Sequence, residues 1–246
     1  MDYLLLFLLL VVLASQALLF YKVRKIHLAS YRLLGAAQES GALYQQLQAY
    51  DGLMRLIRPV APLPLLRGWA ASPDLLFTLA KHTIKHKPVS ILECSSGSST
   101  MVLARCCQLN GVGHVYSLEH DEHFAEQTRE GLVEQGLEEW ASVIHAPLIP
   151  TGDAGQPWYD LTRLQAPEGG FDMLVIDGPP ATTSKHARYP ALPQLDRLLN
   201  PGARVFLDDA ARGEEKQILA RWQQELPHYT EALLPFDKGA AVLTKG

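Results

Sequence analysis

Hydrophobic and polar positions follow two different patterns along this chain. From residue 4 to residue 20 the chain is apolar and carries no charged side chain. From residue 89 onward, short apolar runs typical of buried strands alternate with segments whose apolar residues recur at helical spacing. This alternation predicts an α/β domain with a doubly wound, mostly parallel, Rossmann-like sheet and helices on both faces.

The predicted strands are short, apolar, and separated by helices or turns. They cover residues 89–94, 114–119, 142–146, 171–177 and 203–208. The predicted helices cover residues 100–110 and 121–135, then the segments around 192–199 and 218–226, and residues 147–170 form a Gly/Pro-rich insertion. Residues 229–234 and 240–244 flank Asp237-Lys238-Gly239 and predict an antiparallel hairpin at the C-terminal end of the sheet.

The apolar N-terminal segment, residues 3–21, predicts a single transmembrane helix. Nineteen helical residues reach roughly 28 Å, which is about the thickness of a hydrocarbon core. Lys22, Arg24 and Lys25 follow the segment, and Met1 and Asp2 before it are not basic. The positive-inside rule therefore places the rest of the chain in the cytoplasm. A cleaved signal peptide and a buried core helix are the alternatives, and the missing basic residue before the apolar run speaks against the signal peptide.

The chain is accordingly predicted to have three parts. They are a transmembrane anchor at 3–21, a helical and Pro-rich connector at 22–71, and a catalytic domain at 72–246. The domain starts at Ser72-Pro73-Asp74, where a capping serine, a first-turn proline and an acidic residue favour a helix N-terminus.

Composition excludes several classes of protein. With 48% hydrophobic residues among 246, the chain can bury enough apolar surface to fold, which excludes intrinsic disorder. Three cysteines, Cys94, Cys106 and Cys107, do not form a disulfide framework, so the chain is interpreted as reduced and intracellular. A net charge of −4 provides no globally basic surface for nucleic acid.

Acidic residues end the predicted parallel strands, where such sheets bind their ligands. They are Glu93, Glu119, Asp177, Asp208 and Asp209. The segment from Glu93 to Thr100 is made of small residues that let the backbone approach a ligand at a helix N-terminus. It retains only Gly97 of a dinucleotide G-x-G-x-x-G pattern, and an acid before it suits an ammonium group better than a pyrophosphate. Glu119 is placed to accept both hydroxyls of a ribose. A plain polar turn and a solvated strand-end acid are the alternative interpretations.

These residues resemble the first motif of class I S-adenosylmethionine-dependent methyltransferases, over about residues 72–244. Glu93-Cys94-Ser95-Ser96-Gly97-Ser98-Ser99 looks like the family's acidic, glycine-rich motif, with Ser95 and Ser99 in place of glycines. The resemblance implies S-adenosylmethionine as cofactor, held by Ser95, Gly97 and Ser99. It also implies that Glu93 lies near the methionine amino group, that Glu119 holds the ribose, and that the adenine rests near His145 and Ala146.

A second resemblance concerns the acids after residue 176. Asp177 with Asp208-Asp209 is similar to the metal site of catechol-type O-methyltransferases, which implies Mg²⁺ or another divalent cation on these three oxygen ligands. Such an ion would orient an acceptor hydroxyl and lower its pKa, while Lys185 or His186 takes the proton. Helix capping by Asp208 and Asp209, and an exposed loop position for Lys185 and His186, are the alternatives. The family's lysine lies closer to the aspartate than Lys185 does.

The sequence therefore predicts a membrane-anchored methyltransferase acting on oxygen of a small-molecule, sugar or lipid-linked acceptor at the cytoplasmic face. It resembles bacterial membrane-anchored methyltransferases of surface-glycan pathways. An inactive membrane scaffold with the same fold, and a nicotinamide-dependent oxidoreductase, are the competing hypotheses. Trp158-Tyr159 and residues 65–69 are candidates for an apolar lid, ordinary packing or membrane contact.

Overall fold

The computed structural model describes residues 2–66, 68, 70–152 and 155–246. The chain divides after Gln45 into two compact units, of which the second extends from Gln46 to Gly246. Residues 67 and 69 of the predicted lid lie outside the described residues.

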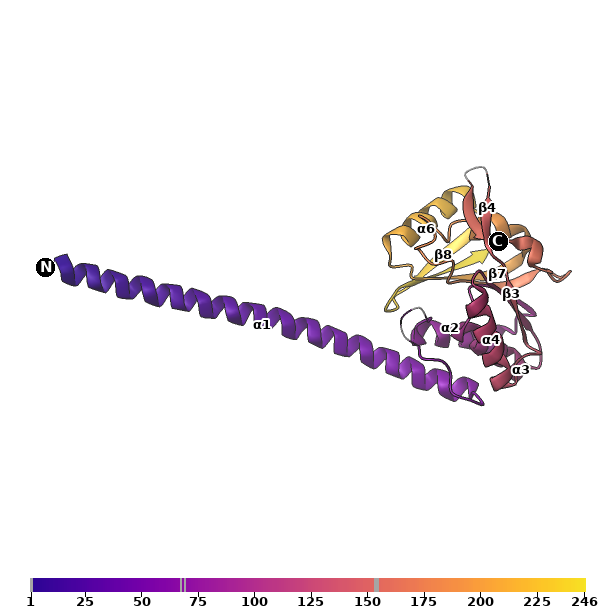
Figure 1. Cartoon of the computed structure of the whole chain (residues 1–246), viewed down its shortest axis with the longest axis horizontal. Coiled ribbons are helices and arrows are strands. Elements are labelled where there is room, and N and C mark those ends of the chain that lie inside the picture. Colours follow the sequence, from indigo (N-terminus) through magenta and orange to yellow (C-terminus); the bar gives the residue numbers. More distant parts are fainter. Residues whose placement is uncertain (1, 67, 69, 153–154) are drawn as a thin grey trace. The chain divides into compact units, whose positions relative to one another are not determined.

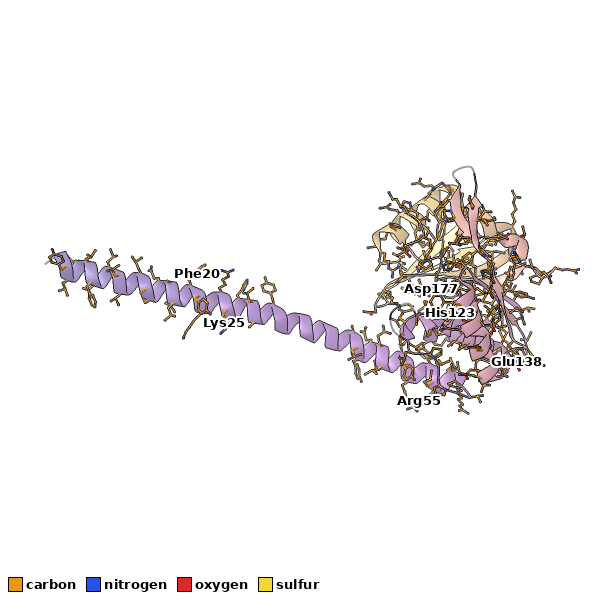
Figure 2. All side chains as sticks on the ribbon, in the orientation of Figure 1. Phe20, Lys25, Arg55, His123, Glu138 and Asp177 are labelled. Carbon is orange, nitrogen blue, oxygen red and sulfur yellow. The ribbon has the colours of Figure 1, made fainter. Side chains whose placement is uncertain are left out.

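The first unit is part of one long helix, α1 (Asp2–Ile57). Its stretch Tyr3–Tyr31 is long and apolar enough to cross a membrane: an 18-residue window in it has a mean hydropathy of 2.6, and none of that window is buried. The side chains of residues 3–31 are exposed, among them Phe20 and Lys25 (Figure 2). The predicted N-terminal apolar helix is therefore confirmed as a helix.

The second unit starts with the end of α1. Leu53 and Ile57, which the sequence places in the connector, are fully buried in the core of this unit. The Pro-rich residues 58–66 after them form no helix or strand. The Gln135 amide ties this segment down, because it donates to the Ala61 carbonyl at 2.7 Å and accepts from the Ala61 N–H at 3.1 Å.

A seven-stranded sheet forms the centre of the second unit, in the order β3-β2-β1-β6-β7-β9-β8. Its strands are β1 (Ser90–Cys94), β2 (His114–Glu119), β3 (Ala141–His145), β6 (Phe171–Ile176), β7 (Leu199–Asp208), β8 (Tyr229–Leu234) and β9 (Ala240–Lys245). The pairs from β3 to β7 are parallel, while β7–β9 and β9–β8 are antiparallel. The predicted doubly wound sheet with a C-terminal hairpin is confirmed.

Helices cover both faces of this sheet and bury one apolar cluster each. On one side lie α2 (Pro73–His86), α3 (Ser98–Asn110) and α4 (Glu122–Gln135), and on the other α6 (Gly213–Glu225) (Figure 1). The predicted helix around 192–199 is a short α5 (Ala191–Leu195) followed by a 3₁₀ turn, Asp196–Leu198, and α5 packs on the α6 side. Buried strand residues alternate between the two clusters, as Ile91 and Leu92 do.

Two local features differ from the sequence prediction. The insertion contains an antiparallel ribbon of β4 (Leu148–Thr151) and β5 (Gln156–Tyr159), followed by the 3₁₀ turn Leu161–Arg163. Trp158 and Tyr159 of β5 are fully buried in the cluster on the α6 side, so they pack and do not form a lid. The last parallel strand, predicted at 203–208, begins earlier, at Leu199, and the register of β7 with β6 shifts between Phe171 and Met173.

Candidate functional site

A cleft of about 690 Å³ opens at the carboxyl ends of the central strands. It lies where β1 has β2 on one side and β6 on the other, which is the position where doubly wound sheets bind ligands. The described chain segments that line it are the β1–α3 loop, the first half of α4, the segments after β6 and β7, the turn between β8 and β9, and part of the segment before α2 (Pro64, Gly68, Ala70 and Ala71). Among the lining side chains are Ser95, Ser99, Glu119, His120, Phe124, Asp177, Arg188, Asp209, Arg212 and Lys238.

The backbone of the β1–α3 loop has an unusual conformation where it borders this cleft. Ser95 and Gly97 have φ values of 109° and 133°, a region that non-glycine residues rarely adopt. A Cβ atom at Gly97 would meet no atom within 4 Å, so this residue borders open space. Ser95 is held by its N–H bond to the Leu118 carbonyl at 2.9 Å and by the Ser117 hydroxyl, which donates to its carbonyl at 2.6 Å. Neighbouring strand β2 therefore stabilises the strained loop.

Glu93 lies beneath the loop and is fully buried. Its Oε2 accepts from the Thr100 hydroxyl at 2.6 Å, and the Thr100 oxygen in turn accepts from the Gly97 N–H at 3.0 Å. Its Oε1 has no hydrogen-bond partner among the described residues. Burial raises the pKa of Glu93 to about 7, and the nearby charge of Asp177 adds to this, although hydroxyl hydrogen bonds oppose it. An unpartnered carboxylate oxygen in a buried site favours a cationic ligand.

Glu119 ends β2 and connects three segments at the edge of the cleft. Its Oε2 accepts from the N–H and from the hydroxyl of Ser96, each at 3.0 Å. Its Oε1 accepts from the N–H of Asp121 at 3.1 Å and lies 2.9 Å from Nδ1 of His120. Burial raises the pKa of Glu119, but the hydrogen bonds of His120 and Asp121 outweigh it and leave the pKa lowered. Glu119 is thus an ionised acceptor that also orders the β1–α3 loop.

The three aspartates at the carboxyl ends of β6 and β7 come together, as the sequence predicts. Ligand oxygens of Asp177, Asp208 and Asp209 all lie within 4.8 Å of one another. Burial, with the charges of Asp177 and Asp209, raises the pKa of Asp208 to about 7. Burial also raises the pKa of Asp177, against the opposing charge of Arg188.

A glycine makes the close approach of β6 to the β1–α3 loop possible. A Cβ atom at Gly178 would lie 2.5 Å from the Tyr159 hydroxyl and 3.1 Å from Cβ of Ser95. Because backbone and buried ring leave no space there, only glycine lets Asp177 lie beside this loop.

Six of the predicted residues are not among the described residues that line the cleft: Glu93 and Asp208, which are buried, and Lys185, His186, His145 and Ala146. Lys185 is exposed, and the ring of His186 lies 2.7 Å from the side-chain oxygen of Gln217 on α6. His145 pairs with Glu122, and Ala146 is buried with its N–H bonded to the Glu119 carbonyl at 2.7 Å. The catalytic roles of Lys185 and His186, and the adenine contacts of His145 and Ala146, remain predictions to which this geometry gives no support.

Other cleft residues were not identified from the sequence. His120 and Phe124 lie on the β2–α4 side, and Arg188, Arg212 and Lys238 on the side of the aspartates. The sequence could have predicted His120 as a cleft residue, because it directly follows Glu119 and side chains that follow a strand end border the same cleft. The three basic residues have no such signal, since each lies in a loop whose path depends on distant contacts.

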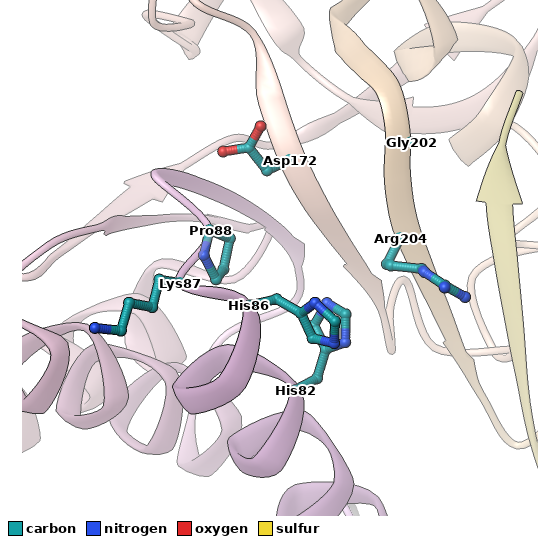
Figure 3. A pocket seen from close by; sticks show the side chains of 7 residues that line it. All are labelled: His82, His86, Lys87, Pro88, Asp172, Gly202 and Arg204. Carbon is teal, nitrogen blue, oxygen red and sulfur yellow. The ribbon is translucent and has the colours of Figure 1, made fainter.

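A second cavity, of about 440 Å³, lies on the opposite edge of the sheet (Figure 3). It is lined by His82 and His86 of α2, whose rings stack at 4.4 Å, together with Arg204 of β7 and Asp172 at the start of β6. Burial and the neighbouring charges of His86 and Arg204 lower the pKa of His82 to about 4. Because this cavity borders the amino end of β6, it is separate from the site built by the strand-end acids.

Comparison with known proteins agrees with the fold. Residues 92–210 match a family model described as a methyltransferase domain. No curated protein shows significant sequence similarity to the chain.

Solved structures of methyltransferases share the fold at low identity. The SAH-bound methyltransferase PaMTH1 of Podospora anserina is 17% identical, with a TM-score of 0.56 over 80% of this chain and 88% of that one. An O-methyltransferase from Bacillus cereus in complex with SAH is 20% identical, with a TM-score of 0.54 over 81% and 91%. The O-methyltransferase TomG from Streptomyces achromogenes, involved in tomaymycin synthesis and in complex with SAM, is 20% identical, with a TM-score of 0.55 over 81% and 88%.

Proposed function

We propose that this chain, whose residues 92–210 match the model of a methyltransferase domain, is a class I S-adenosylmethionine-dependent O-methyltransferase. The observation that carries the proposal is the cleft at the carboxyl ends of β1, β2 and β6, with a strained small-residue loop and Glu119 on its wall. The similar proteins from Podospora, Bacillus and Streptomyces contain SAH or SAM, which supports the same cofactor here.

The residues of the cleft fit S-adenosylmethionine. Glu93 is buried beneath the loop, where the cofactor's ammonium group would lie, and a cation there would favour the ionised form of this carboxyl, whose Oε1 has no other partner among the described residues. Gly97 borders open space, and the N-terminus of α3 after it offers N–H groups to a carboxylate. Glu119 would accept the ribose hydroxyls in exchange for part of its bonding to Ser96 and His120. When bound, the cofactor supplies a methyl group activated by a positively charged sulfur.

Asp177 is the proposed general base on the acceptor side. Its side chain lines the cleft next to the β1–α3 loop, and burial raises its pKa. A carboxylate there can receive the proton of an acceptor hydroxyl as the oxygen attacks the methyl group. Positioning of the two reactants supplies the rest, since methyl transfer in line needs no covalent intermediate.

The N-terminal stretch Tyr3–Tyr31 is proposed to anchor the enzyme in a membrane, with the methyltransferase domain in the cytoplasm. The mean hydropathy of 2.6 over an 18-residue window supports insertion, and the basic residues Lys22, Arg24 and Lys25 support this orientation. The acceptor is then a small molecule, a sugar or a lipid-linked molecule at the cytoplasmic face.

The test starts with cofactor binding to the full chain in detergent. Isothermal calorimetry should show one site for S-adenosylmethionine and no binding of a nicotinamide dinucleotide. Tighter binding of the dinucleotide, or no binding of either, would refute the proposal. Transfer of labelled methyl groups into a membrane extract then separates an enzyme from an inactive scaffold.

A matched pair of variants tests the role of Asp177 in that transfer assay. We expect Asp177→Asn to lower the rate by about a hundredfold or more while cofactor affinity stays unchanged, because general-base catalysis contributes on the order of 10²–10⁴-fold. Asp160→Asn, at the N-cap of the turn Leu161–Arg163, is the control and should keep full activity.

A further inference from the structure

Arg188 occupies the space between the three aspartates. Its side chain is 5% exposed and comes from the segment between β6 and α5. Its Nη2 donates to the carbonyl of Asp177, to Oδ1 of Asp177 at 3.1 Å and to Oδ2 of Asp209 at 2.9 Å. Its Nη1 donates to the carbonyl of Asp208 at 2.9 Å and lies 3.7 Å from Oε1 of Glu215. One guanidinium thus contacts the ends of both β6 and β7.

The same three aspartates are the ligands that the resemblance to catechol-type enzymes assigns to a divalent cation. Their spacing alone would suit a hard ion, since the ligand oxygens lie within 4.8 Å of one another. Two of the three carboxylates, however, already bind the buried guanidinium. A dication on these oxygens would lie beside a fixed positive charge in a buried site, where charges are poorly screened. The cluster as it stands does not fit a divalent metal.

Further positive charges surround the cluster. Nη1 of Arg212 lies 2.9 Å from Oδ2 of Asp209, and the charge of Lys238 acts on Asp177. Three basic side chains therefore face three aspartates and the buried Glu215. This compensation removes the need for an ion to hold the carboxylates together.

We propose that Arg188 is the resident cation of this site and takes the place of a divalent metal. The inference rests on the proposed methyltransferase function and deepens it in one respect. With no metal to chelate, the acceptor need not carry two adjacent oxygen ligands, and a single hydroxyl suffices as the methyl acceptor. Arg188 acts as a positioning residue, because it holds Asp177 and Asp209 in place.

The first experiment measures metal binding to the wild-type chain directly. Full-length protein is freed of metal with a chelator and titrated with Mn²⁺, with free Mn²⁺ followed by electron paramagnetic resonance. We expect no binding up to about 1 mM and no effect of 5 mM Mg²⁺ on the melting temperature. Stoichiometric binding with a Kd below about 100 µM, or a rise of about 5 °C in melting temperature with Mg²⁺, would overturn the proposal.

The second experiment releases the aspartates. In Arg188→Met the shape of the side chain is largely kept and its charge is lost, so the variant should bind Mn²⁺ at least tenfold more tightly than wild type and gain thermal stability from Mg²⁺. Arg221→Met, an exposed arginine paired only with Glu225 among the salt bridges found in the described residues, is the control and should bind no Mn²⁺. If Arg188→Met is unfolded in chelator, recovery of its circular dichroism by Mg²⁺ supports the proposal. Failure to bind Mn²⁺, or to recover with Mg²⁺, contradicts it.

A separate measurement distinguishes this inference from the proposed function. S-adenosylmethionine binds on the β1–α3 side, so its affinity for the metal-free wild type should equal that in 5 mM Mg²⁺. Loss of all cofactor binding would refute the methyltransferase function and leave the metal result as it stands.

Discussion

Replacing Glu119 by glutamine should weaken both the fold and cofactor binding. Two donors reach each carboxylate oxygen: the N–H and hydroxyl of Ser96 on Oε2, and the Asp121 N–H and His120 Nδ1 on Oε1. In Glu119→Gln one oxygen becomes an amide nitrogen that cannot accept a hydrogen bond, so two of the four donors lose their acceptor. The other two donors then bond to an oxygen that carries no charge. At about 1.5–3 kcal/mol for each bond to a charged group, and allowing for water at the cleft edge, we expect a loss of about 2–4 kcal/mol in the free energy of unfolding.

Urea unfolding of the cofactor-free chain measures the first effect, and calorimetry with S-adenosylmethionine the second. The affinity should fall by about tenfold or more, since the variant loses a charged acceptor for the ribose and a tether of the β1–α3 loop. Glu126→Gln is the control, because this glutamate is exposed and bonded at 2.8 Å to Arg129, and should change stability by less than about 0.5 kcal/mol. If Glu119→Gln matches the control in both measurements, Glu119 neither orders the loop nor binds the ribose.

Three further changes test the buried acid, the loop residues and the anchor. The pKa of Glu93 is raised to about 7 in the folded state, whereas in the unfolded chain it is about 4.5. Between these two pH values the folded state keeps a proton that the unfolded chain releases. The free energy of unfolding therefore falls as pH rises from about 4.5 to about 7. Glu93→Gln, without that charge, should be more stable than wild type by about 2–3 kcal/mol at pH 8 and equal to it at pH 4, as measured by urea unfolding. Lys185→Ala and His186→Ala should each keep the methyl-transfer rate within about twofold, since neither residue lines the cleft, whereas a tenfold loss would restore the predicted catalytic role. Deleting residues 1–20 should move the protein from the membrane to the soluble fraction with unchanged cofactor affinity, because the core of the second unit begins only at Leu53. Sedimentation measures the first effect and calorimetry the second. A truncated protein that still sediments with membranes, or that no longer binds the cofactor, would contradict this prediction.

Local pattern was enough to predict the sheet and the acids at its edge. Strands such as β2 and β6 are apolar runs ended by a charged residue, and this information lies within a few neighbouring positions. Parallel strands bring their carboxyl ends to one edge, so Glu93, Glu119 and Asp177 could be assigned to one site before any contact was known. The N-terminal apolar helix was predictable for the same reason, since length and composition alone define it.

The ribbon β4–β5 and the position of Lys185 were not predictable in this way. The Pro- and Gly-containing insertion does not show the alternation of a strand, yet Trp158 and Tyr159 are buried because the α6 side of the core accepts them. Lys185 follows Asp177 closely in sequence, but its neighbour His186 is bonded to Gln217 on α6 and to Glu214 through its N–H. These contacts direct the loop away from the cleft.

The sequence by itself determined which residue types end the strands, and hence the edge of the sheet at which we expect a ligand to bind beside carboxylates. Only the tertiary structure decided which hydrogen-bond donors and positive charges stabilise those carboxylates. Glu119 is saturated by donors from two loops, and the aspartates after β6 and β7 share the guanidinium of Arg188, which lies eleven positions after Asp177. The physical reason is that a strand-end acid is placed by its own strand, whereas the partner of a buried charge is selected by whichever segments the packed core brings within about 3 Å of it.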